Sequence, residues 1–311
     1  MKKNMLLLNT VRGVKKSPGR FVAILTIIAI GCAFYAGLSA VSTDLKNSGW
    51  KYYREYALAD VQIKSTLGFN GDEIEKLSDG EHFDSGYAGY SADLFVENNG
   101  GQSAVTVLSY SADQPLNKLY LMEGRLPEKA GECVADYDSM HKISFKIGDT
   151  VKLSADGDND VADYLNQSEY TVVGLVKSPV YVSYDRGSTT IGTGSVSAFI
   201  YVPEENFAYD AYTDLYLSVT GAMDESVKPF SDEYNDIVAA AEEYAEGMSA
   251  QLLSERSDEI RADADEQIAD AKEKLADGQK KYDDAKKDYD KGLNEYNKSY
   301  SQINEQKKEL T

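Results

Sequence analysis

Residues 21–41 read FVAILTIIAIGCAFYAGLSAV, a run of 21 residues that contains no charged side chain. A helix rises about 1.5 Å per residue, so roughly 20 residues match the roughly 30 Å hydrocarbon layer of a bilayer. The run therefore predicts a transmembrane helix with Phe21 and Val41 as its ends. One alternative is a signal peptide cleaved near residues 37–40 (GLSA), and another is a buried core helix. Because the apolar run exceeds the length of about 7–15 residues that a signal peptide has, a retained span is favoured.

The charges on the two sides of this run differ in sign. Residues 1–20 hold six lysine and arginine residues and no acidic residue, whereas residues 42–311 hold the other 26 basic and all 52 acidic residues. Because lysine and arginine favour the cytoplasmic side, we expect residues 1–20 to be cytoplasmic and residues 42–311 to be extracytoplasmic. Apolar side chains in residues 5–16 lie at helical spacing opposite the cations, which predicts a basic amphipathic helix on the inner surface of the cell membrane. Membrane lipid is therefore an expected partner.

The composition excludes several classes of protein. The 311 residues carry a formal net charge of −20, and nucleic-acid phosphates require a cationic surface, so we expect no nucleic-acid partner. The two cysteines, Cys32 and Cys133, are too few for a disulfide scaffold or a cysteine-rich metal site. The two histidines, His82 and His141, would need carboxylates from elsewhere in the fold to bind zinc.

Residues 42–56 continue the helical pattern of the span and predict a stalk helix that ends near Tyr56. Trp50 and the tyrosines near it fit two interpretations equally well. They could form an aromatic belt at the membrane surface, or they could pack under the domain that follows.

Residues 57–231 predict a mixed α+β domain with its own core. They hold five of the six prolines and several short runs of alternating polarity. The predicted strands are 60–64, 104–110, 150–153, 170–176, 198–202 and 215–220. Short helices are predicted at 70–77, with Asn70 as cap, and at 203–208, with Pro203 in the first turn. The residues expected in the core are Val61, Ile63, Val105, Val107, Val151, Leu153, Val172, Leu175, Ile200 and Val202.

Residues 232–311 predict one long coiled-coil helix. Large side chains recur every seven residues, at Ile268, Leu275, Tyr282, Tyr289, Tyr296, Ile303 and Leu310. Small residues follow the first five of them three positions later, at Ala271, Gly278, Ala285, Gly292 and Ser299, and this heptad pattern predicts a seam for a partner helix. Glycine inside a helix destabilises it by up to about 1 kcal/mol. Two glycines on the seam therefore indicate that the partner helix packs closely against them. The partner is either an identical chain or a returning helix, and we expect the second, with this helix as one half of a hairpin in a longer protein.

A search for catalytic and ligand-binding motifs gives only structural interpretations. Residues 156–160 (DGDND) resemble the start of a calcium loop, but the twelfth position is Gln167 and not glutamate, so we expect a turn. Residues 187–195 (GSTTIGTGS) lack the lysine of a phosphate-binding loop and predict a flexible loop. Asp149 and Arg125 fit a turn and a structural ion pair. We therefore expect no enzyme, no cofactor and no metal.

Several short motifs in order over about residues 5–220 resemble a known family. After the basic lead and the span come 59–63 (ADVQI), 121–127 (LMEGRLP), 131–134 (GECV), 147–151 (IGDTV), 170–176 (YTVVGLV) and 199–203 (FIYVP). In this order they resemble the N-terminal part of an FtsX-like ABC transporter permease with a MacB-type extracytoplasmic core domain. The coiled-coil helix departs from the usual core domain and is similar to an insertion in the large permeases of Gram-positive bacteria.

The resemblance implies a membrane subunit that does not hydrolyse ATP itself. Its expected partners are a cytoplasmic ABC-type ATPase and a second permease copy or a related permease. The ATPase would move the membrane helices, and the stalk would carry this motion to the extracytoplasmic domain for export or other mechanical work. One alternative is a single-span surface protein whose coiled coil binds a partner or oligomerises. Another is an extracellular enzyme, for which the sequence nominates no acid or base.

Overall fold

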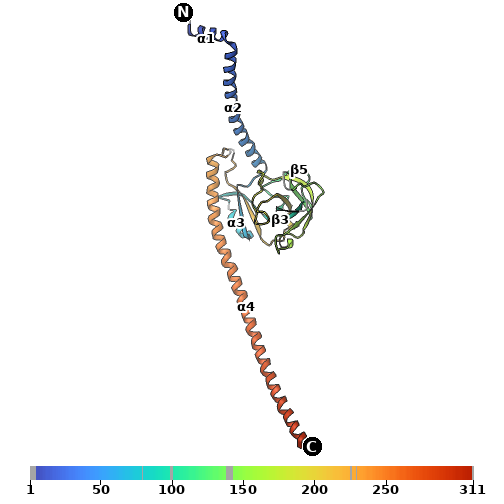
Figure 1. Cartoon of the computed structure of the whole chain (residues 1–311). Coiled ribbons are helices and arrows are strands. Elements are labelled where there is room, and N and C mark those ends of the chain that lie inside the picture. Colours follow the sequence, from blue (N-terminus) through green and yellow to red (C-terminus); the bar gives the residue numbers. More distant parts are fainter. Residues whose placement is uncertain are drawn as a thin grey trace. The chain divides into compact units, whose positions relative to one another are not determined.

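The computed structural model describes residues 5–78, 80–98, 101–137, 143–224, 226–228 and 230–309. The contacts within the chain divide it into two units, Met1–Ala245 and Glu246–Thr311. The first unit contains α1 (Met5–Lys16), α2 (Pro18–Glu55), all the strands and the beginning of α4 (Asp232–Glu309) (Figure 1). The boundary between the units therefore falls inside α4 and not at its first residue.

The apolar run lies in α2, which is longer than the predicted span. This helix begins with Pro18, whose missing N–H costs nothing in a first turn, and Tyr56 caps its end. Among the described residues, α2 is the one helix long and apolar enough to cross a membrane. The predicted span and the predicted stalk are thus parts of one continuous helix.

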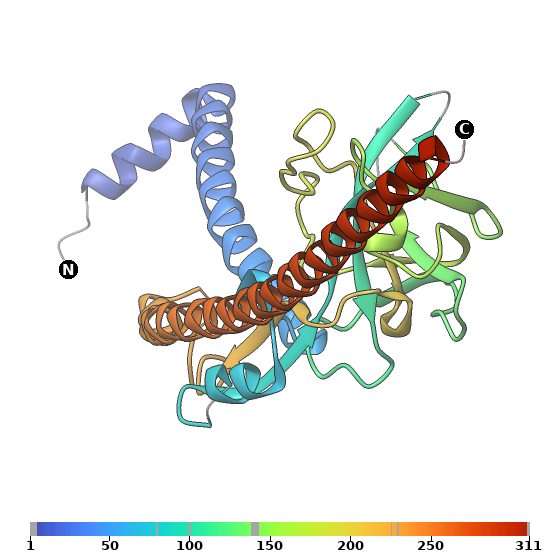
Figure 2. The ribbon, with the colours of Figure 1, turned by 90° about the horizontal axis from the view of Figure 1, so that it is seen from below.

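The first sheet of the domain has three antiparallel strands. Its order is β1 (Val61–Phe69), β10 (Tyr212–Val219), β2 (Phe83–Gly89), so that β10, yellow-orange in Figure 2, lies in the middle. The short helix α3 (Gly71–Leu77) follows β1. The Glu73 N–H donates to Asn70 Oδ1 at 2.9 Å, and the Asn70 N–H donates to Glu73 Oε2 at 2.8 Å. This capping box confirms the helix predicted after Asn70.

The second sheet closes into a small barrel. Its strands are β3 (Ser91–Asn98), β4 (Gly101–Tyr110), β5 (Tyr120–Gly124), β6 (Glu132–Asp136), β7 (Thr150–Ser154), β8 (Glu169–Lys177) and β9 (Ala198–Pro203). The order is β5-β8-β6-β9-β4-β3-β7, and an additional pairing of β7 with β8 closes a ring of six strands. Closure leaves few unpaired backbone groups at sheet edges, where another chain could otherwise add a strand.

Alternating side chains fill the barrel and cover its outside. Ala198, Ile200 and Val202 of β9 belong to the large cluster of buried residues inside. Phe199 and Tyr201 of the same strand belong to a second cluster on the opposite face. Nine of the ten predicted core residues are buried, and Ile63 on β1 is half-buried. Successive side chains of a strand point to opposite faces of the sheet, so one strand contributes to both clusters.

The predicted secondary structure is confirmed for six strands and incomplete for the rest. The structure adds β2, β3, β5 and β6, which the sequence pattern did not predict. The helix predicted at 203–208 is a single 3-10 turn, η2 (Glu204–Asn206). Pro203 precedes this turn, and Phe207, which has extended backbone angles, ends it. The turn therefore does not continue as an α-helix.

The second unit is the remainder of α4 and is one uninterrupted helix. The predicted seam residues from Ile268 to Ile303 have exposed fractions between 50% and 73%, while Leu310 lies outside the described residues. A Cβ added at Gly278 or Gly292 would meet nothing within 4 Å beyond the neighbouring backbone of its own helix. The long helix is therefore confirmed, and the pairing of its seam stays a prediction.

Candidate functional site

The candidate functional site is the junction where α2 meets the folded domain. Trp50, near the end of α2, is only 7% exposed. Its ring meets the rings of Phe230 and Tyr234 edge to face, with centroids 5.7 and 5.1 Å apart. Such contacts each contribute about 0.5–1.5 kcal/mol beyond the burial itself. Of the two interpretations of Trp50, the structure supports packing under the domain.

Backbone hydrogen bonds hold the residues that follow α2. The Asn117 N–H donates to the Ala57 carbonyl at 2.7 Å, and the Lys118 N–H donates to the Tyr56 carbonyl at 2.8 Å. The Asn117 side chain in turn accepts the Ala59 N–H at 3.0 Å. Ala57 has a φ of 47°, an uncommon value for a residue with a side chain. The hydrogen bonds to the loop between β4 and β5 therefore fix the direction in which the chain leaves the helix.

Asp60 links three elements through one side chain. Its Oδ2 accepts the Val219 N–H at 2.8 Å, and its Oδ1 accepts the Tyr234 hydroxyl at 2.9 Å. Its own N–H donates to the Leu217 carbonyl at 2.9 Å. Burial raises the pKa of Asp60 above its ordinary value, and the hydrogen bonds from Val219 and Tyr234 offset part of this effect. The exit of α2, the end of β10 and the beginning of α4 are thus connected.

The beginning of α4 is held on the domain by further aromatic contacts. Tyr244 stacks on His82 with ring centroids 4.0 Å apart, and its ring lies 6.3 Å from that of Phe83 in β2. Val238 and Ala241 of the same helix are buried. The edge of the small sheet at β2 therefore contacts the first turns of α4.

A cavity of about 340 Å³ lies beside the end of α2. The residues that line it are Tyr52, Tyr120, Asp136, Lys177, Ser178, Tyr181, Val182, Arg186 and Phe199. Burial and the neighbouring Tyr56 raise the pKa of Tyr52 to about 12, so its hydroxyl stays protonated at neutral pH. Tyr52 of α2 and residues on the outer face of the barrel, such as Phe199, therefore line the same cavity.

A buried ion pair forms part of the wall of this cavity. The Arg186 Nε donates to Asp136 Oδ2 at 2.7 Å, and its Nη2 donates to Asp136 Oδ1 at 3.0 Å. The guanidinium also donates to the carbonyls of Tyr181 and Ser183 and lies 5.5 Å from the centre of the Phe199 ring. This two-point pairing fixes the loop that follows β8 against the barrel.

The residues that the sequence singled out have structural roles. Arg125 forms a two-point ion pair with Glu132, at 2.7 and 2.5 Å, and this hydrogen bonding lowers the pKa of Glu132 to about 2. Asp149 accepts the Lys146 N–H at 2.9 Å and closes a turn. Asp160 of the DGDND segment caps the 3-10 turn η1 (Val161–Asp163). The ion pair and both turns are confirmed.

Other predicted positions lie apart from the junction or outside the described residues. Phe21 and Val41, the predicted ends of the span, are both exposed. Cys32 is exposed and Cys133 is buried, and neither forms a disulfide. His141 lies outside the described residues.

Most residues of the junction carry no signal in the sequence. In the sequence, Asp60 stands out only as the start of the predicted strand 60–64 and as part of the ADVQI motif, and Phe230 and Tyr234 belong to no predicted site. No helical spacing could have indicated this pair, because Phe230 precedes α4 and has a φ of 52°, while Tyr234 lies in the first turn of the helix.

Comparisons with known proteins give partial likenesses. No protein-family model matches this chain, and no curated protein matches it. The chain is similar to the extracellular domain of the noncanonic ABC-type transporter YknZ from Gram-positive bacteria, with 12% identity, a TM-score of 0.31, and coverage of 51% of this chain and 76% of that one. It is similar to the periplasmic region of MacB from Actinobacillus actinomycetemcomitans, with the same identity and TM-score and coverage of 59% and 76%. Both are extracytoplasmic parts of ABC-type transporters, and at these values neither likeness assigns a family to this chain.

Proposed function

We propose that this chain is a membrane subunit of an ABC-type transporter of the FtsX and MacB kind. In this proposal a separate cytoplasmic ATPase supplies the energy, and residues 42–311 work on the extracytoplasmic side. The observation that carries the proposal is the junction, where one unbroken helix from Pro18 to Glu55 has a buried tryptophan near its end and is followed by the hydrogen-bonded Asp60. A flexible linker would lose a displacement that this connection can transmit.

The proposed mechanism is mechanical coupling through the helix end. A displacement of α2 along its axis acts on Trp50 and, through the backbone after Tyr56, on β1 and β10. Because Asp60 bonds to both β10 and α4, the same displacement acts on the beginning of α4. Each contact is worth about 1 kcal/mol, so the junction resists separation through several contacts together and not through one.

The long helix α4 would serve as a second rigid element. The proposal assigns it a coiled-coil partner along Ile268, Leu275, Tyr282, Tyr289, Tyr296 and Ile303, either in a hairpin or from a second permease. The first turns of α4 are held on the domain by Tyr234, which bonds to Asp60, and by Tyr244, which stacks on His82. Movement of the domain would therefore also act on this helix.

Purification of the full chain from membranes of its natural host tests the function. We expect an affinity-tagged chain in mild detergent to co-purify with a protein that contains a P-loop ATPase motif, and the complex to hydrolyse ATP. Trp50→Ala should change the ratio of transport to ATP hydrolysis, while Leu45→Ala, on an exposed part of the same helix, should not. A folded chain that purifies without any ATP-hydrolysing partner would refute the proposal.

The second candidate function is a single-span surface protein that oligomerises or binds a partner through its coiled coil. The exposed heptad row of α4 favours it. Mass measurements on the full chain in detergent distinguish the two candidates. A dimer that becomes a monomer in the variant Tyr282→Ser/Tyr289→Ser/Tyr296→Ser, with the matched surface variant Lys280→Ser/Lys287→Ser/Lys298→Ser still dimeric, would support this second function.

A further inference from the structure

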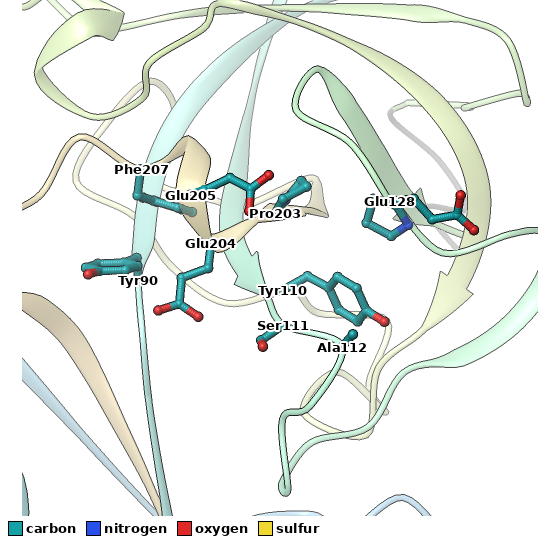
Figure 3. A pocket seen from close by; sticks show the side chains of 10 residues that line it. Tyr90, Tyr110, Ser111, Ala112, Glu128, Pro203, Glu204, Glu205 and Phe207 are labelled. Carbon is teal, nitrogen blue, oxygen red and sulfur yellow. The ribbon is translucent and has the colours of Figure 1, made fainter.

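A second cavity, of about 660 Å³, opens where two parallel strands of the barrel end. Tyr110 at the end of β4 is the register partner of Pro203 at the end of β9. The residues that line the cavity are Tyr90, Tyr110, Ser111, Ala112, Pro127, Glu128, Pro203, Glu204, Glu205 and Phe207 (Figure 3). Its volume falls within the range of about 300–1,000 Å³ that small-molecule sites occupy.

Aromatic rings form much of the wall. Tyr90 stacks on Phe207 with centroids 5.2 Å apart and rings inclined by 20°, and it stacks on Tyr212 at 4.8 Å. These contacts hold the Tyr90 ring in place before any ligand arrives. Tyr110 supplies another ring to the lining, and in the view of Figure 3 the Glu204 carboxylate lies between Tyr90 and Tyr110. An aromatic face next to a carboxylate attracts cations through both the ring quadrupole and the charge.

The charges of the lining have one sign. Three of the residues that line the cavity are glutamates, and none is lysine or arginine. Arg125 lies 4.0 Å from Glu128 on the surface, but no described residue forms an ion pair with Glu204 or Glu205. Burial, and to a smaller extent the neighbouring Tyr212 and the charge of Glu204, raise the pKa of Tyr90 to about 12, so its hydroxyl stays protonated at neutral pH.

We infer that this cavity binds a small organic cation that has an apolar body, such as an aryl-alkyl ammonium compound. The glutamates match the positive charge, and Tyr90, Tyr110, Pro127 and Pro203 match the apolar part. A metal ion fits less well, because within the described residues no three metal-ligating side chains come together and aromatic faces offer it no ligand. This inference does not depend on the proposed function, since binding requires neither an ATPase nor a membrane orientation.

Binding of benzyltrimethylammonium to the full chain in lipid nanodiscs tests the inference. Saturation-transfer NMR titrations give its Kd, and benzenesulfonate serves as an anionic probe of similar size. The variant Glu204→Gln/Glu205→Gln should raise the Kd for the cation about tenfold or more, because two nearby charges are removed. The matched variant Glu97→Gln/Glu169→Gln removes two exposed charges outside the cavity and should leave the Kd within about twofold.

A third variant tests the aromatic wall. Tyr110→Leu keeps an apolar side chain but removes the ring, and it should raise the Kd about threefold. The emission of Trp50, the only tryptophan, shows whether each variant is folded. The inference is overturned if benzyltrimethylammonium shows no saturable binding, if benzenesulfonate binds equally well, or if the Glu204→Gln/Glu205→Gln variant binds the cation as the natural chain does.

Discussion

The Tyr234 hydroxyl donates a hydrogen bond of 2.9 Å to the Asp60 carboxylate, across 174 residues of sequence. Asp60 follows the apolar helix and Tyr234 lies in the first turns of α4, so this contact connects the two long helices of the chain at their domain ends. Because Asp60 also accepts the Val219 N–H, the end of β10 is part of the same connection. Separating α4 from the residues that follow α2 would break the bond between Tyr234 and Asp60.

The first prediction concerns the pH dependence of this connection. Because burial raises the pKa of Asp60 above 3.8 in the folded chain, the folded state binds a proton more readily than the unfolded state. Between 3.8 and the raised value, the contribution of Asp60 to the free energy of unfolding therefore falls as the pH rises. Asparagine does not titrate, so the stability of the natural chain relative to Asp60→Asn should fall across this window and stay constant above it.

Thermal unfolding of both chains at a series of pH values checks this prediction. Comparison with Asp60→Asn removes the contributions of the other acidic residues, which both chains share. A relative stability of the natural chain that rises with pH in this window would show that Asp60 is not buried as described.

The second prediction concerns Trp50. Trp50→Ala should lower the free energy of unfolding of the domain by about 3–5 kcal/mol, because it removes a buried ring that contacts Phe230 and Tyr234. Leu45→Ala on the same helix, where the side chain is 72% exposed, should change it by less than about 0.5 kcal/mol. Thermal unfolding in detergent measures both.

The fluorescence of the natural chain provides an independent check, since Trp50 is the only tryptophan. Its emission should be shifted to the blue and should be shielded from acrylamide. Emission typical of an indole in water would place Trp50 outside the domain and would contradict the junction.

The strands that the sequence predicted are those with β-branched residues and a clear alternation, such as β8 and β9. The strands that it missed have weaker patterns. Strand β2 reads FDSGYAG, with two glycines, and β5 reads YLMEG and is largely exposed. Their extended form depends on pairing with β10 and β8, which is a tertiary effect that local propensity does not contain.

The junction could not be predicted for a related reason. Trp50 and Phe230 are far apart in the sequence, and the local patterns of a single sequence do not indicate which distant residues are in contact. The parallel pairing of β4 with β9 in the barrel depends in the same way on segments that are far apart in the sequence. What local chemistry did determine is the capping box of Asn70, the Arg125 ion pair and the turn at Asp149, each of which involves residues at most seven positions apart.

The third prediction compares two ion pairs of the barrel. Asp136→Asn leaves the Arg186 guanidinium, which is 5% exposed, without its opposite charge, and should lower the free energy of unfolding by about 3–5 kcal/mol. Glu132→Gln removes the same charge from a pair whose Arg125 side chain is 45% exposed, and should lower the free energy of unfolding much less, because solvent screens this pair. Equal effects of the two variants in denaturant unfolding would contradict the assigned burial.

The central claim is that a membrane-spanning helix carries a domain on the far side of the membrane, and labelling of intact cells with a membrane-impermeant maleimide tests it most directly. The natural cysteines give little background, because Cys133 is buried and Cys32 lies in the predicted span. Lys15→Cys and Ser168→Cys each add one exposed thiol, before the span and in the domain. The account predicts that Ser168→Cys is labelled in intact cells and that Lys15→Cys is labelled only after permeabilisation. Protection of Ser168→Cys in intact cells, or a mature chain that begins beyond Ala40, would contradict it.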